Sequence, residues 1–506
     1  MDTSQRNAKA LRKLVSEIDL HRQELSLEEA VLDKNSKLLI RPRSLSAGLA
    51  IGPLISFREY SYTFDRGVSK PIVFCESCRD MDLPGLDQLG GLVIMIGDIT
   101  SHLVVRANSL SIPVVCVDDT QAETLRHFIG SECITLIACR EEAAMFIGVA
   151  QSKIESNWEL LANLARGSRS FRGIEVRANI DDRNDAQRAI RAGADGVGTW
   201  RIENYLGRLQ FEHILHDAAW DAVRGESFDQ SRSMMALSEI LVSELCSILE
   251  QLQGLPLVVR LLDIPLARLL RLTECAALPR SLCINISKGD PVFSVRGARL
   301  GVIYPAIAEL QLRSIVIATS LAVNKGTTPN IALQIPFVTH ASEIGWYRRL
   351  FSNIASEFPS TGAEGNLIKI GITIETPRAA ITAAELARGS DFFCFGTNDL
   401  TQYTWALDRD SGFVEIIGPY IKQGLLDGSP FSSLDSEGVG AFIEYAVSKG
   451  RSANPSLKIG ITGVLGNRPE MINYFRQLKF DYVSVSIPQL PLVALSYAQE
   501  FLKEAE

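Results

Sequence analysis

The sequence predicts an α/β protein in which a (β/α)8 barrel follows a smaller domain of short strands and helices. Two observations predict this fold class. Eight short apolar runs, each ending in polar residues, lie between residues 174 and 486 and are separated by stretches that can hold helices. Short β-branched runs punctuated by Gly and Pro occupy residues 39–149 instead. Because buried parallel strands are apolar along their whole length, the repeated strand–helix pattern indicates a parallel barrel.

Length and composition limit the class of protein. A chain of 506 residues is long enough for two or three domains. A net charge of −8 argues against a nucleic-acid surface, and no apolar run reaches the length of a membrane span, so neither partner is expected. Nine scattered cysteines and an N-terminus without the apolar core of a signal peptide predict reduced thiols in a cytoplasmic protein.

Four segments are expected along the chain, each with its own character. They are a polar, helix-prone N-terminal segment (residues 1–38), the small domain (39–149), a helical linker (150–172) and the barrel (173–506).

The eight barrel strands are predicted from the apolar runs. They are Ile174–Ile180, Gly196–Trp200, Pro256–Asp263, Ile331–Val338, Lys369–Glu375, Asp391–Thr397, Lys458–Gly463 and Tyr482–Ser486. In such a barrel the chemistry lies at the carboxyl ends of the strands. The polar residues that end each run are therefore the candidates for a site.

Two carboxylates stand at neighbouring strand ends. Glu375 ends one run, and Asp399 follows the next, with an Ala- and Leu-rich helix between them. Mg²⁺ is usually held by one or two carboxylates together with substrate oxygens. The pair therefore predicts a magnesium site. The alternative is that each residue only caps the helix that follows it.

Four arginines lie at or after strand ends: Arg201, Arg260, Arg296 and Arg409. Guanidinium groups bind phosphate and carboxylate bidentately, and together with a metal ion they stabilise a transferring phosphoryl group. The set predicts an anionic, phosphorylated ligand. Any one of them alone is more simply a surface ion-pair partner.

One histidine of the small domain is a candidate nucleophile. Thr100 or Ser101 is a good helix N-cap, and His102 begins the helix that follows. Helix N-termini favour anions, and a histidine can carry a phosphoryl group covalently. The alternative is an ordinary histidine near a helix cap.

Several motifs resemble the phosphoenolpyruvate-utilising enzyme family, in particular its dikinase branch. They are Thr100-Ser-His102, Gly196-Val-Gly-Thr-Trp-Arg-Ile-Glu203, Arg260-Leu-Leu-Asp-Ile-Pro-Leu, Arg296-Gly-Ala-Arg-Leu-Gly, Ile374-Glu-Thr-Pro-Arg378, Phe395-Gly-Thr-Asn-Asp-Leu-Thr-Gln402 and Asp427-Gly-Ser-Pro-Phe-Ser-Ser-Leu-Asp. The resemblance covers roughly residues 40–500.

The resemblance implies a mechanism and assigns the candidate residues to it. A swivelling domain would carry phosphorylated His102 to the barrel and exchange the phosphoryl group with pyruvate or its enol phosphate. Glu375 and Asp399 match the Mg²⁺ ligands of the family. The residues that match those with which the family binds phosphate and carboxylate are Arg201, Arg260, Arg296, Arg409, Thr397 and Asn398. A homodimer is implied as well.

The sequence departs from the family pattern where the family has Cys-Gly-Glu at the end of strand seven. Here Thr462 replaces the cysteine that protonates the enolate carbon, and Val464 replaces the acid. A thiol can be tuned to act as a general acid, whereas an aliphatic hydroxyl is a far weaker acid. In the small domain, Asp98 and Asn108 replace a glycine and an arginine, which makes the surroundings of His102 less favourable for an anion.

Three functions remain open at this point. The protein is a phosphotransferase of this family with altered chemistry at Thr462, a pseudoenzyme that binds a ligand or partner, or a dikinase half that works with a separate phosphoryl donor or acceptor protein. All three are consistent with a ligand related to phosphoenolpyruvate or pyruvate.

Overall fold

The computed structural model describes most of the chain. The described ranges are 37–46, 48–57, 71–75, 89–95, 104, 107, 112–131, 134–138, 143–147, 154–207, 209–270, 294–358, 368–407, 416–431 and 433–504. His102, Arg409 and the N-terminal segment up to residue 36 lie outside them. The chain divides into two compact units: Met1–Gly173 with Arg409–Ser433 and Ser486–Glu506, and Ile174–Asp408 with Leu434–Val485.

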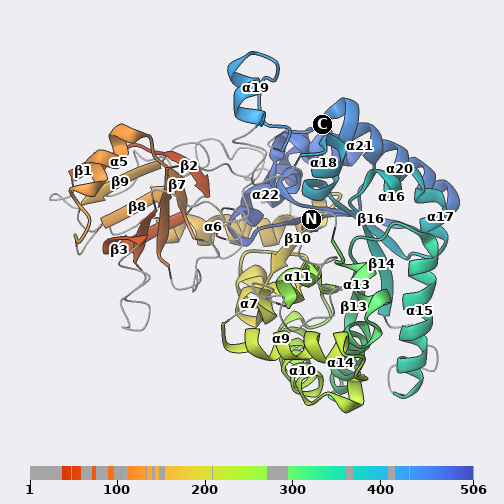
Figure 1. Ribbon diagram of the computed structural model, residues 1–506. Coiled ribbons are helices and arrows are strands. Elements are labelled where there is room, and N and C mark those ends of the chain that lie inside the picture. The colour runs from red at the N-terminus through yellow and green to blue at the C-terminus, as the bar shows by residue number, and fades with distance from the viewer. Residues whose placement is uncertain are drawn as a thin grey trace, which may run out of the picture. The chain divides into compact units, whose positions relative to one another are not determined.

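The first unit contains two sheets. One has the order β1 (Lys37–Ile40), β9 (Ala143–Ile147), β8 (Ile134–Ala138) and β3 (Gly48–Gly52), and all its pairs are antiparallel. The other has the order β2 (Arg43–Ser46), β7 (Val114–Cys116), β6 (Gly91–Ile94), β5 (Ile72–Cys75) and β4 (Leu54–Ser56). Strands β4 to β7 are parallel, and β2 is antiparallel to β7. Figure 1 shows these strands with the short helix α5 (Asp119–Arg126) beside them.

Local chemistry explains the boundary of α5. The Asp118 side chain accepts a hydrogen bond from the Gln121 backbone N–H at 2.8 Å, and the Gln121 side chain accepts one from the Asp118 N–H at 3.3 Å. This reciprocal capping box satisfies two backbone donors that would otherwise lack partners. The core of these sheets is built from fully buried β-branched and aromatic residues, among them Ile72, Phe74 and Val115.

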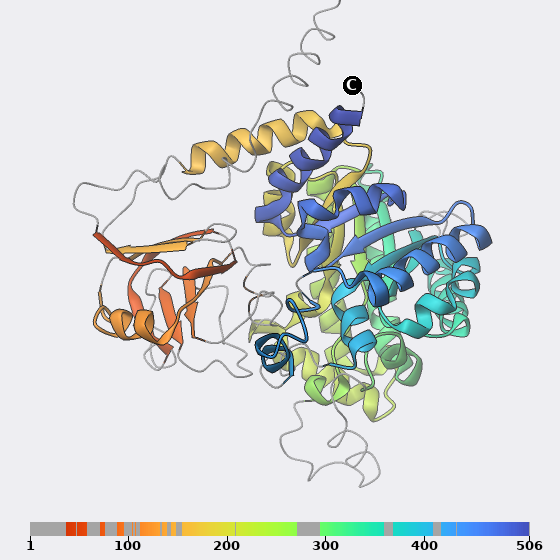
Figure 2. The same ribbon diagram turned by 90° about the horizontal axis from the view of Figure 1, so that it is seen from above.

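A helix follows the strands of the small domain. Helix α6 (Ile154–Gly167) and the short 3-10 helix η2 (Ser168–Phe171) pack against the C-terminal helix α22 (Leu490–Glu504) within the same unit. Figure 2 shows α6 and α22 side by side. The helix that follows the small domain and the C-terminal helix therefore meet in the first unit.

The cysteines differ from the sequence expectation at one position. Cys116, Cys246 and Cys394 are free thiols. Cys75 is disulfide-bonded. The expectation that all nine thiols are reduced is wrong for Cys75.

The second unit contains the predicted barrel. Its eight strands form a closed parallel barrel in sequence order. They are β10 (Glu175–Ile180), β11 (Val197–Arg201), β12 (Pro256–Arg260), β13 (Asn330–Ile335), β14 (Ile368–Ile374), β15 (Phe392–Gly396), β16 (Lys458–Thr462) and β17 (Tyr482–Val485). β17 pairs with β10, which closes the ring. The predicted fold class, a (β/α)8 barrel preceded by a small α/β domain, is confirmed.

Helices cover the barrel on the outside (Figures 1 and 2). They include α7 (Arg183–Arg191), α8 (Ile202–Leu206), α9 (Leu209–Val223), α10 (Arg232–Leu252), α11 (Leu266–Leu269), α13 (Ala298–Ile303), α14 (Pro305–Asn324), α15 (Ala341–Ser356), α16 (Pro377–Ile381), α17 (Ala383–Arg388), α18 (Thr397–Trp405), α20 (Ala441–Ala453) and α21 (Ile472–Gln477). Helix α14 is long and apolar enough to cross a membrane by length and composition. However, 67% of its most apolar window is buried, and it packs along α10 as a core helix does.

The barrel interior changes from apolar to polar toward the carboxyl ends of the strands. Val258, Phe392, Cys394 and Tyr482 form an internal cluster. Small residues make room for the rings: a Cβ at Gly460 would lie 2.0 Å from the Tyr482 ring. Higher on the same inward faces stand polar side chains, since residues two apart on a strand share a face. They are Asn179, Gln334, Thr373 and Ser484.

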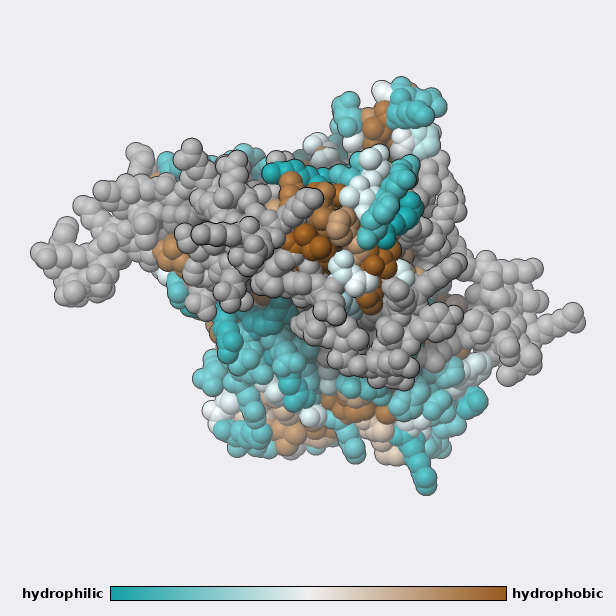
Figure 3. Space-filling model, turned by 90° about the vertical axis from the view of Figure 1, so that its left-hand side faces the viewer, coloured by the Kyte–Doolittle hydropathy of each residue, from teal (hydrophilic) through white to brown (hydrophobic). Residues whose placement is uncertain are grey.

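The molecular surface is mixed rather than uniformly polar. On the face drawn in Figure 3, hydrophilic side chains cover much of the lower part and are interrupted by separate apolar groups. Among the described residues, the exposed large apolar side chains are distributed over several helices, such as Met235 on α10, Ile303 on α13 and Ile381 on α16. Scattered exposed apolar residues of this kind are ordinary in soluble proteins.

Candidate functional site

Two arginines at the ends of β11 and β12 are each held by a carboxylate. In the strand register Arg201 pairs with Arg260, so both side chains reach the same rim. Arg201 contacts Asp181 through Nε at 3.2 Å and Nη2 at 3.0 Å. Arg260 donates to Glu203 Oε1, while the buried Arg260 Nε and Glu203 Oε2 have no hydrogen-bond partner. The site thus holds one unsatisfied buried donor and one unsatisfied buried acceptor.

The charge of Arg260 is secured by its surroundings. Burial by itself would lower the pKa of this guanidinium, but the carboxylates of Glu203, Asp263 and Glu375 outweigh burial and raise the pKa above its ordinary value. Arg260 therefore stays cationic at every accessible pH. A permanently charged, partly buried guanidinium at the barrel rim is a binding group for an anion.

A third arginine reaches the same rim from the chain segment before α13. Arg296 donates two hydrogen bonds to Asp263, at 2.8 and 2.7 Å, and its Nη1 lies 3.8 Å from Asp399 Oδ1. Its guanidinium also lies 5.0 Å from the centre of the Phe337 ring. Burial opposes the charge of Arg296, but Asp263 and Asp399 outweigh burial and raise the pKa well above its ordinary value.

The two predicted metal-binding carboxylates lie close together. Glu375 follows β14, is 1% exposed, and accepts a hydrogen bond from the Phe337 N–H at 2.5 Å. Burial, then repulsion from Asp399 and Asp263, raises the pKa of Glu375 to about 8. Like charges repel one another in this cluster of acids. A cation at this place would relieve this repulsion.

The alternative that these two acids cap helices is wrong in the structure. The side chain of Thr376, not Glu375, caps α16 by accepting from the Ala379 N–H at 3.2 Å. Helix α18 begins after Gly396 with no side-chain cap, and Asp399 lies within its first turn. Both carboxylates are therefore free of a capping role.

Thr397 and Asn398 occupy the gap between the ends of β15 and β16. Thr397 is 1% exposed and donates from Oγ1 to the Thr462 carbonyl at 3.2 Å. Asn398 Oδ1 accepts from the Val464 N–H at 3.4 Å. The close approach depends on Gly463, whose φ is +105° and whose added Cβ would lie 2.6 Å from Thr397 Oγ1. The Asn398 oxygen is thus engaged by the protein.

The Thr462 hydroxyl joins a hydrogen-bond chain across the barrel. It donates to Asn179 Oδ1 at 3.3 Å, and Ser484 Oγ donates to the same oxygen at 2.7 Å. Asn179 Nδ2 donates to the Ser484 carbonyl at 3.5 Å. The proton of the Thr462 hydroxyl is therefore directed at a neighbouring amide oxygen.

The structure brings together most of the predicted site residues. Arg201, Arg260, Arg296, Glu375, Thr397, Asn398, Asp399 and Thr462 all lie at the carboxyl ends of the barrel strands or in the loops and helix starts that follow them. Predictions for His102 and Arg409 concern residues outside the described part of the chain. The described residues contain no group of three or more His, Cys, Asp or Glu side chains arranged to hold a metal. The pair Glu375 and Asp399 would therefore need oxygens from a ligand or water.

Sequence reasoning missed two polar residues inside the barrel. Asn179 bonds to Thr462, and Gln334 donates to Thr373 Oγ1 at 2.8 Å while its own Oε1 is buried without a partner. Both stand one residue before the end of a strand on its inward face. The signal that could have found them is a polar residue in an otherwise apolar run.

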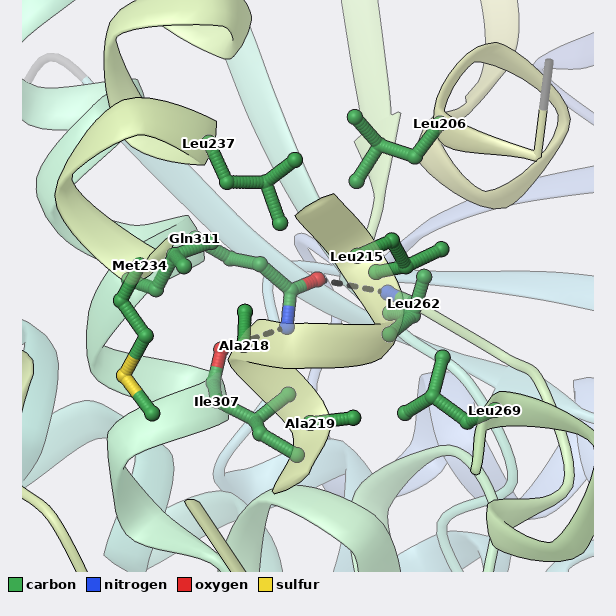
Figure 4. A pocket seen from close by; sticks show the side chains of 11 residues that line it. Leu206, Leu215, Ala218, Ala219, Met234, Leu237, Leu262, Leu269, Ile307 and Gln311 are labelled. Atoms are coloured by element: carbon green, nitrogen blue, oxygen red, sulfur yellow. Dashed lines mark hydrogen bonds between the residues drawn. The ribbon is translucent and has the colours of Figure 1, made fainter. Parts of the chain in front are cut away.

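A separate apolar cavity lies outside the barrel ring, among α8, α9, α10 and α14 (Figure 4). Its volume is about 20 Å³, about that of one water molecule. Gln311 on its wall accepts from the Leu262 N–H at 2.6 Å and donates to the Ile307 carbonyl at 2.8 Å. Leu262 precedes Asp263, so this wall supports the carboxylate that holds Arg296.

Two family matches cover most of the chain. Residues 156–501 match "PEP-utilising enzyme, PEP-binding domain", and residues 68–133, which include His102, match "PEP-utilising enzyme, mobile domain". Similar proteins include pyruvate, phosphate dikinases. The chloroplastic enzyme of Flaveria trinervia is 31% identical over 90% of this chain and 50% of its own length. The enzyme of Rhizobium meliloti (strain 1021) is 29% identical over 95% and 56%.

The chain spans about half the length of the curated relatives it matches. The match to the PEP-binding domain alone covers well over half of the chain and coincides with the barrel that carries the site. The protein therefore belongs to the PEP-utilising enzyme family.

Proposed function

We propose that this protein is a phosphohistidine-dependent phosphotransferase that binds phosphoenolpyruvate, pyruvate or a related phosphorylated carboxylate at the barrel rim. The observation that carries the proposal is the meeting of Arg260 and Arg296 with Glu375 and Asp399 at one end of the barrel. Cationic groups beside a pair of acids suit a ligand that has both anionic oxygens and an associated cation.

Mg²⁺ fits the donor set of this site. Two carboxylates offer the hard oxygen ligands that Mg²⁺ prefers, and burial, followed by repulsion from Asp399, raises the pKa of Glu375, which a bound cation would lower. We assign Glu375 and Asp399 as the ligands. When bound, the ion would neutralise charge on the phosphoryl oxygens. The protein positions it, since the Phe337 N–H holds one Glu375 oxygen in place.

The arginines have separate roles in the proposal. Arg260 and Arg296 are ion-paired to Glu203 and Asp263, so each guanidinium is held in place before a ligand arrives. An arriving phosphate would accept hydrogen bonds from donors that these carboxylates leave free, such as Arg260 Nε. Arg201, Thr397 and Asn398 complete the predicted binding set, and Arg409 belongs to it by family resemblance.

In the proposed transfer, a bond forms between phosphorus and an imidazole nitrogen of His102 as the bond between phosphorus and the substrate oxygen breaks. The electron pair of the broken bond stays on that oxygen, which leaves an enolate when the donor is phosphoenolpyruvate. Thr462 would be a poor acid for that enolate, because its proton points to Asn179 and an aliphatic hydroxyl has a high pKa. Phosphoryl transfer and pyruvate release are therefore separable here.

A second candidate function rests on the same threonine. If the barrel binds its ligand but transfers no phosphoryl group, the protein is a pseudoenzyme that acts as a ligand-binding or partner-binding regulator. The observation in its favour is the hydroxyl of Thr462 in place of an acidic group. In the third candidate function, the chain carries out half of a dikinase reaction together with a separate nucleotide-binding protein.

The deciding experiment uses the full chain, Mg²⁺ and phosphoenolpyruvate carrying labelled phosphate. Acid-labile label on wild type that is absent from His102→Ala, without release of pyruvate, supports the proposed phosphotransferase. Ligand binding by calorimetry without any label supports the regulator. Repeated turnover to pyruvate with an added phosphoryl acceptor protein supports the dikinase half. Absence of both label and binding would rule out the proposed function.

Three further parts of the proposal have their own support. Homodimerisation follows from the family resemblance and is checked by light scattering of the full chain. A separate phosphoryl donor or acceptor protein would deliver or remove the group carried by His102, and the turnover assay above tests for it. A cytoplasmic location rests on the sequence composition, and fractionation of cells that express the chain checks it.

A further inference from the structure

We infer that the barrel site is built for a three-carbon phosphorylated acid that carries a hydroxyl group on carbon 3, where phosphoenolpyruvate has a bare methylene. The inference rests on the proposed function and deepens it, because it names the substrate class of the same site. The residue that carries it is Thr462, at the carboxyl end of β16.

The first step is the direction of the Thr462 hydroxyl proton. A hydroxyl has one proton and two acceptor lone pairs. Asn179 Oδ1 can only accept hydrogen bonds. It accepts one from the Thr462 hydroxyl at 3.3 Å and one from the Ser484 hydroxyl at 2.7 Å. Asn179 keeps this orientation because its Nδ2 donates to the Ser484 carbonyl. With its proton used, Thr462 presents only acceptor lone pairs to the partly exposed side of the residue.

The second step is the location of this acceptor. Thr462 pairs with Gly396 in the strand register, and the Thr462 carbonyl accepts from Thr397 Oγ1 at 3.2 Å. Gly396 in turn borders Glu375, since a Cβ there would lie 2.8 Å from Glu375 Oε2. The acceptor therefore belongs to the rim that holds the carboxylate pair and the arginines.

The third step is the complementary donor beside it. Asn398 Oδ1 accepts from the Val464 N–H at 3.4 Å, so the Asn398 NH₂ group is the end left for a ligand. An acceptor on Thr462 and a donor on Asn398 thus stand on neighbouring strand ends. A hydroxyl group, which both donates and accepts, matches this pair. A methylene or methyl group would leave the acceptor of Thr462 unsatisfied.

The substrate class follows from these groups together. Phosphate and carboxylate are taken by the arginines and the cation, as in the proposed function. The carbon that faces Thr462 carries a hydroxyl that donates to Thr462 Oγ1. This arrangement also gives the threonine a positive role in place of the missing acid, because a substrate of this class needs a hydrogen-bond acceptor there and no proton donor.

The test compares two ligands that differ by that hydroxyl alone: 2-phosphoglycerate and 2-phospholactate, with the same configuration at carbon 2. Affinities of the full chain with Mg²⁺ are measured by calorimetry. We expect wild type to bind 2-phosphoglycerate roughly tenfold to a hundredfold more tightly, as for a site that pairs a substrate hydroxyl. Thr462→Val, which keeps the shape but removes the acceptor, is expected to lower the ratio severalfold, because only the Asn398 donor is left for the hydroxyl.

Controls separate the hydroxyl contact from a structural role of the residue. Thr462→Ser keeps the hydroxyl and should keep the preference. In Thr462→Val the affinity for 2-phospholactate should be no lower than in wild type, which shows that the arginines and the cation still bind. If Thr462→Val does not fold, the wild-type ratio and the serine variant still decide the matter.

The outcomes are distinguishable from failure of the proposed function. Equal binding of both ligands by wild type, or a preference that is as large in Thr462→Val as in wild type, overturns this inference and leaves the phosphorylated-carboxylate site intact. Binding of neither ligand overturns the proposed function and the inference with it. A preference in wild type and Thr462→Ser that is reduced in Thr462→Val supports the inference.

Discussion

Arg296 and Asp263 form a two-point ion pair, with Nε and Nη2 of the arginine 2.8 and 2.7 Å from the two carboxylate oxygens. Asp263 is 1% and Arg296 14% exposed at the side chain. Burial would raise the pKa of Asp263, but Arg296 and then Arg260 outweigh burial and lower it. The pair is thus ionised and rigid, and it fixes the guanidinium beside Asp399.

Replacing Asp263 should therefore destabilise the barrel and weaken ligand binding. Asp263→Asn removes the nearest counter-charge of the buried Arg296 and leaves the more distant Asp399, 3.8 Å away, at a cost of up to about 3–5 kcal/mol in the free energy of unfolding. Urea titration measures it. The matched control is Glu250→Gln, which breaks the exposed ion pair with Lys325 (2.6 Å) and should change stability much less. Equal losses in the two variants would contradict the importance given to burial.

A pH dependence is expected from Asp185 at the start of α7. Burial, then repulsion from Asp181 and Asp182, raises its pKa from 3.8 to about 7, against the opposing effect of Arg188. Between these values the folded chain holds a proton that the unfolded chain has lost. The stabilisation is complete below pH 3.8 and is lost as the pH rises through about 7, at up to about 1.4 kcal/mol per pH unit.

The variant Asp185→Asn should remove that contribution. Unfolding free energies of wild type and variant, measured in urea at pH 5, 6 and 7, are expected to show a less negative slope for the variant. The slope is the informative quantity, since the variant also changes the hydrogen bonds to the Asp181 N–H and Arg188. Parallel slopes would show that Asp185 does not titrate in this range.

Gly463 should be intolerant of a side chain for two separate reasons. Its φ of +105° is strained for other residues, and a Cβ would lie 2.6 Å from Thr397 Oγ1 and 3.2 Å from Asn398 Oδ1. Gly225 has φ of +85° with nothing within 4 Å. Gly225→Ala should therefore lose only the conformational cost of about 1 kcal/mol. Gly463→Ala should lose more and should also weaken calorimetric binding of a phosphorylated carboxylate.

The wall of the apolar cavity gives a prediction about a residue away from the rim. Gln311→Met keeps the shape but leaves the buried Leu262 N–H without its acceptor, which should cost about 1–3 kcal/mol. The neighbouring residue Leu310 lines the same cavity. Leu310→Met should lower the free energy of unfolding by less than about 1.5 kcal/mol. Thermal or urea unfolding compares them. Because Leu262 precedes Asp263, only the Gln311 variant is expected to lower ligand affinity as well.

Much of the fold could be read from local pattern. The bounds of each barrel strand differ by at most three residues from those of a predicted apolar run. For example, β15 spans Phe392–Gly396 and the predicted run spans Asp391–Thr397. The carboxylate pair was also predictable, because consecutive parallel strands place their carboxyl ends side by side. Strand periodicity and strand ends are encoded by neighbouring residues, so the chain itself carries that information.

The contacts that define the site's chemistry depend on closure of the barrel. Asn179 and Thr462 are 283 residues apart and meet only because β17 pairs with β10. Arg296 follows a long insertion, and only tertiary packing places its guanidinium group against Asp263 instead of in solvent. Sequence pattern determined which side chains reach the rim. The tertiary structure decided which atoms they present, because hydrogen-bond direction and burial arise from partners distant in the chain.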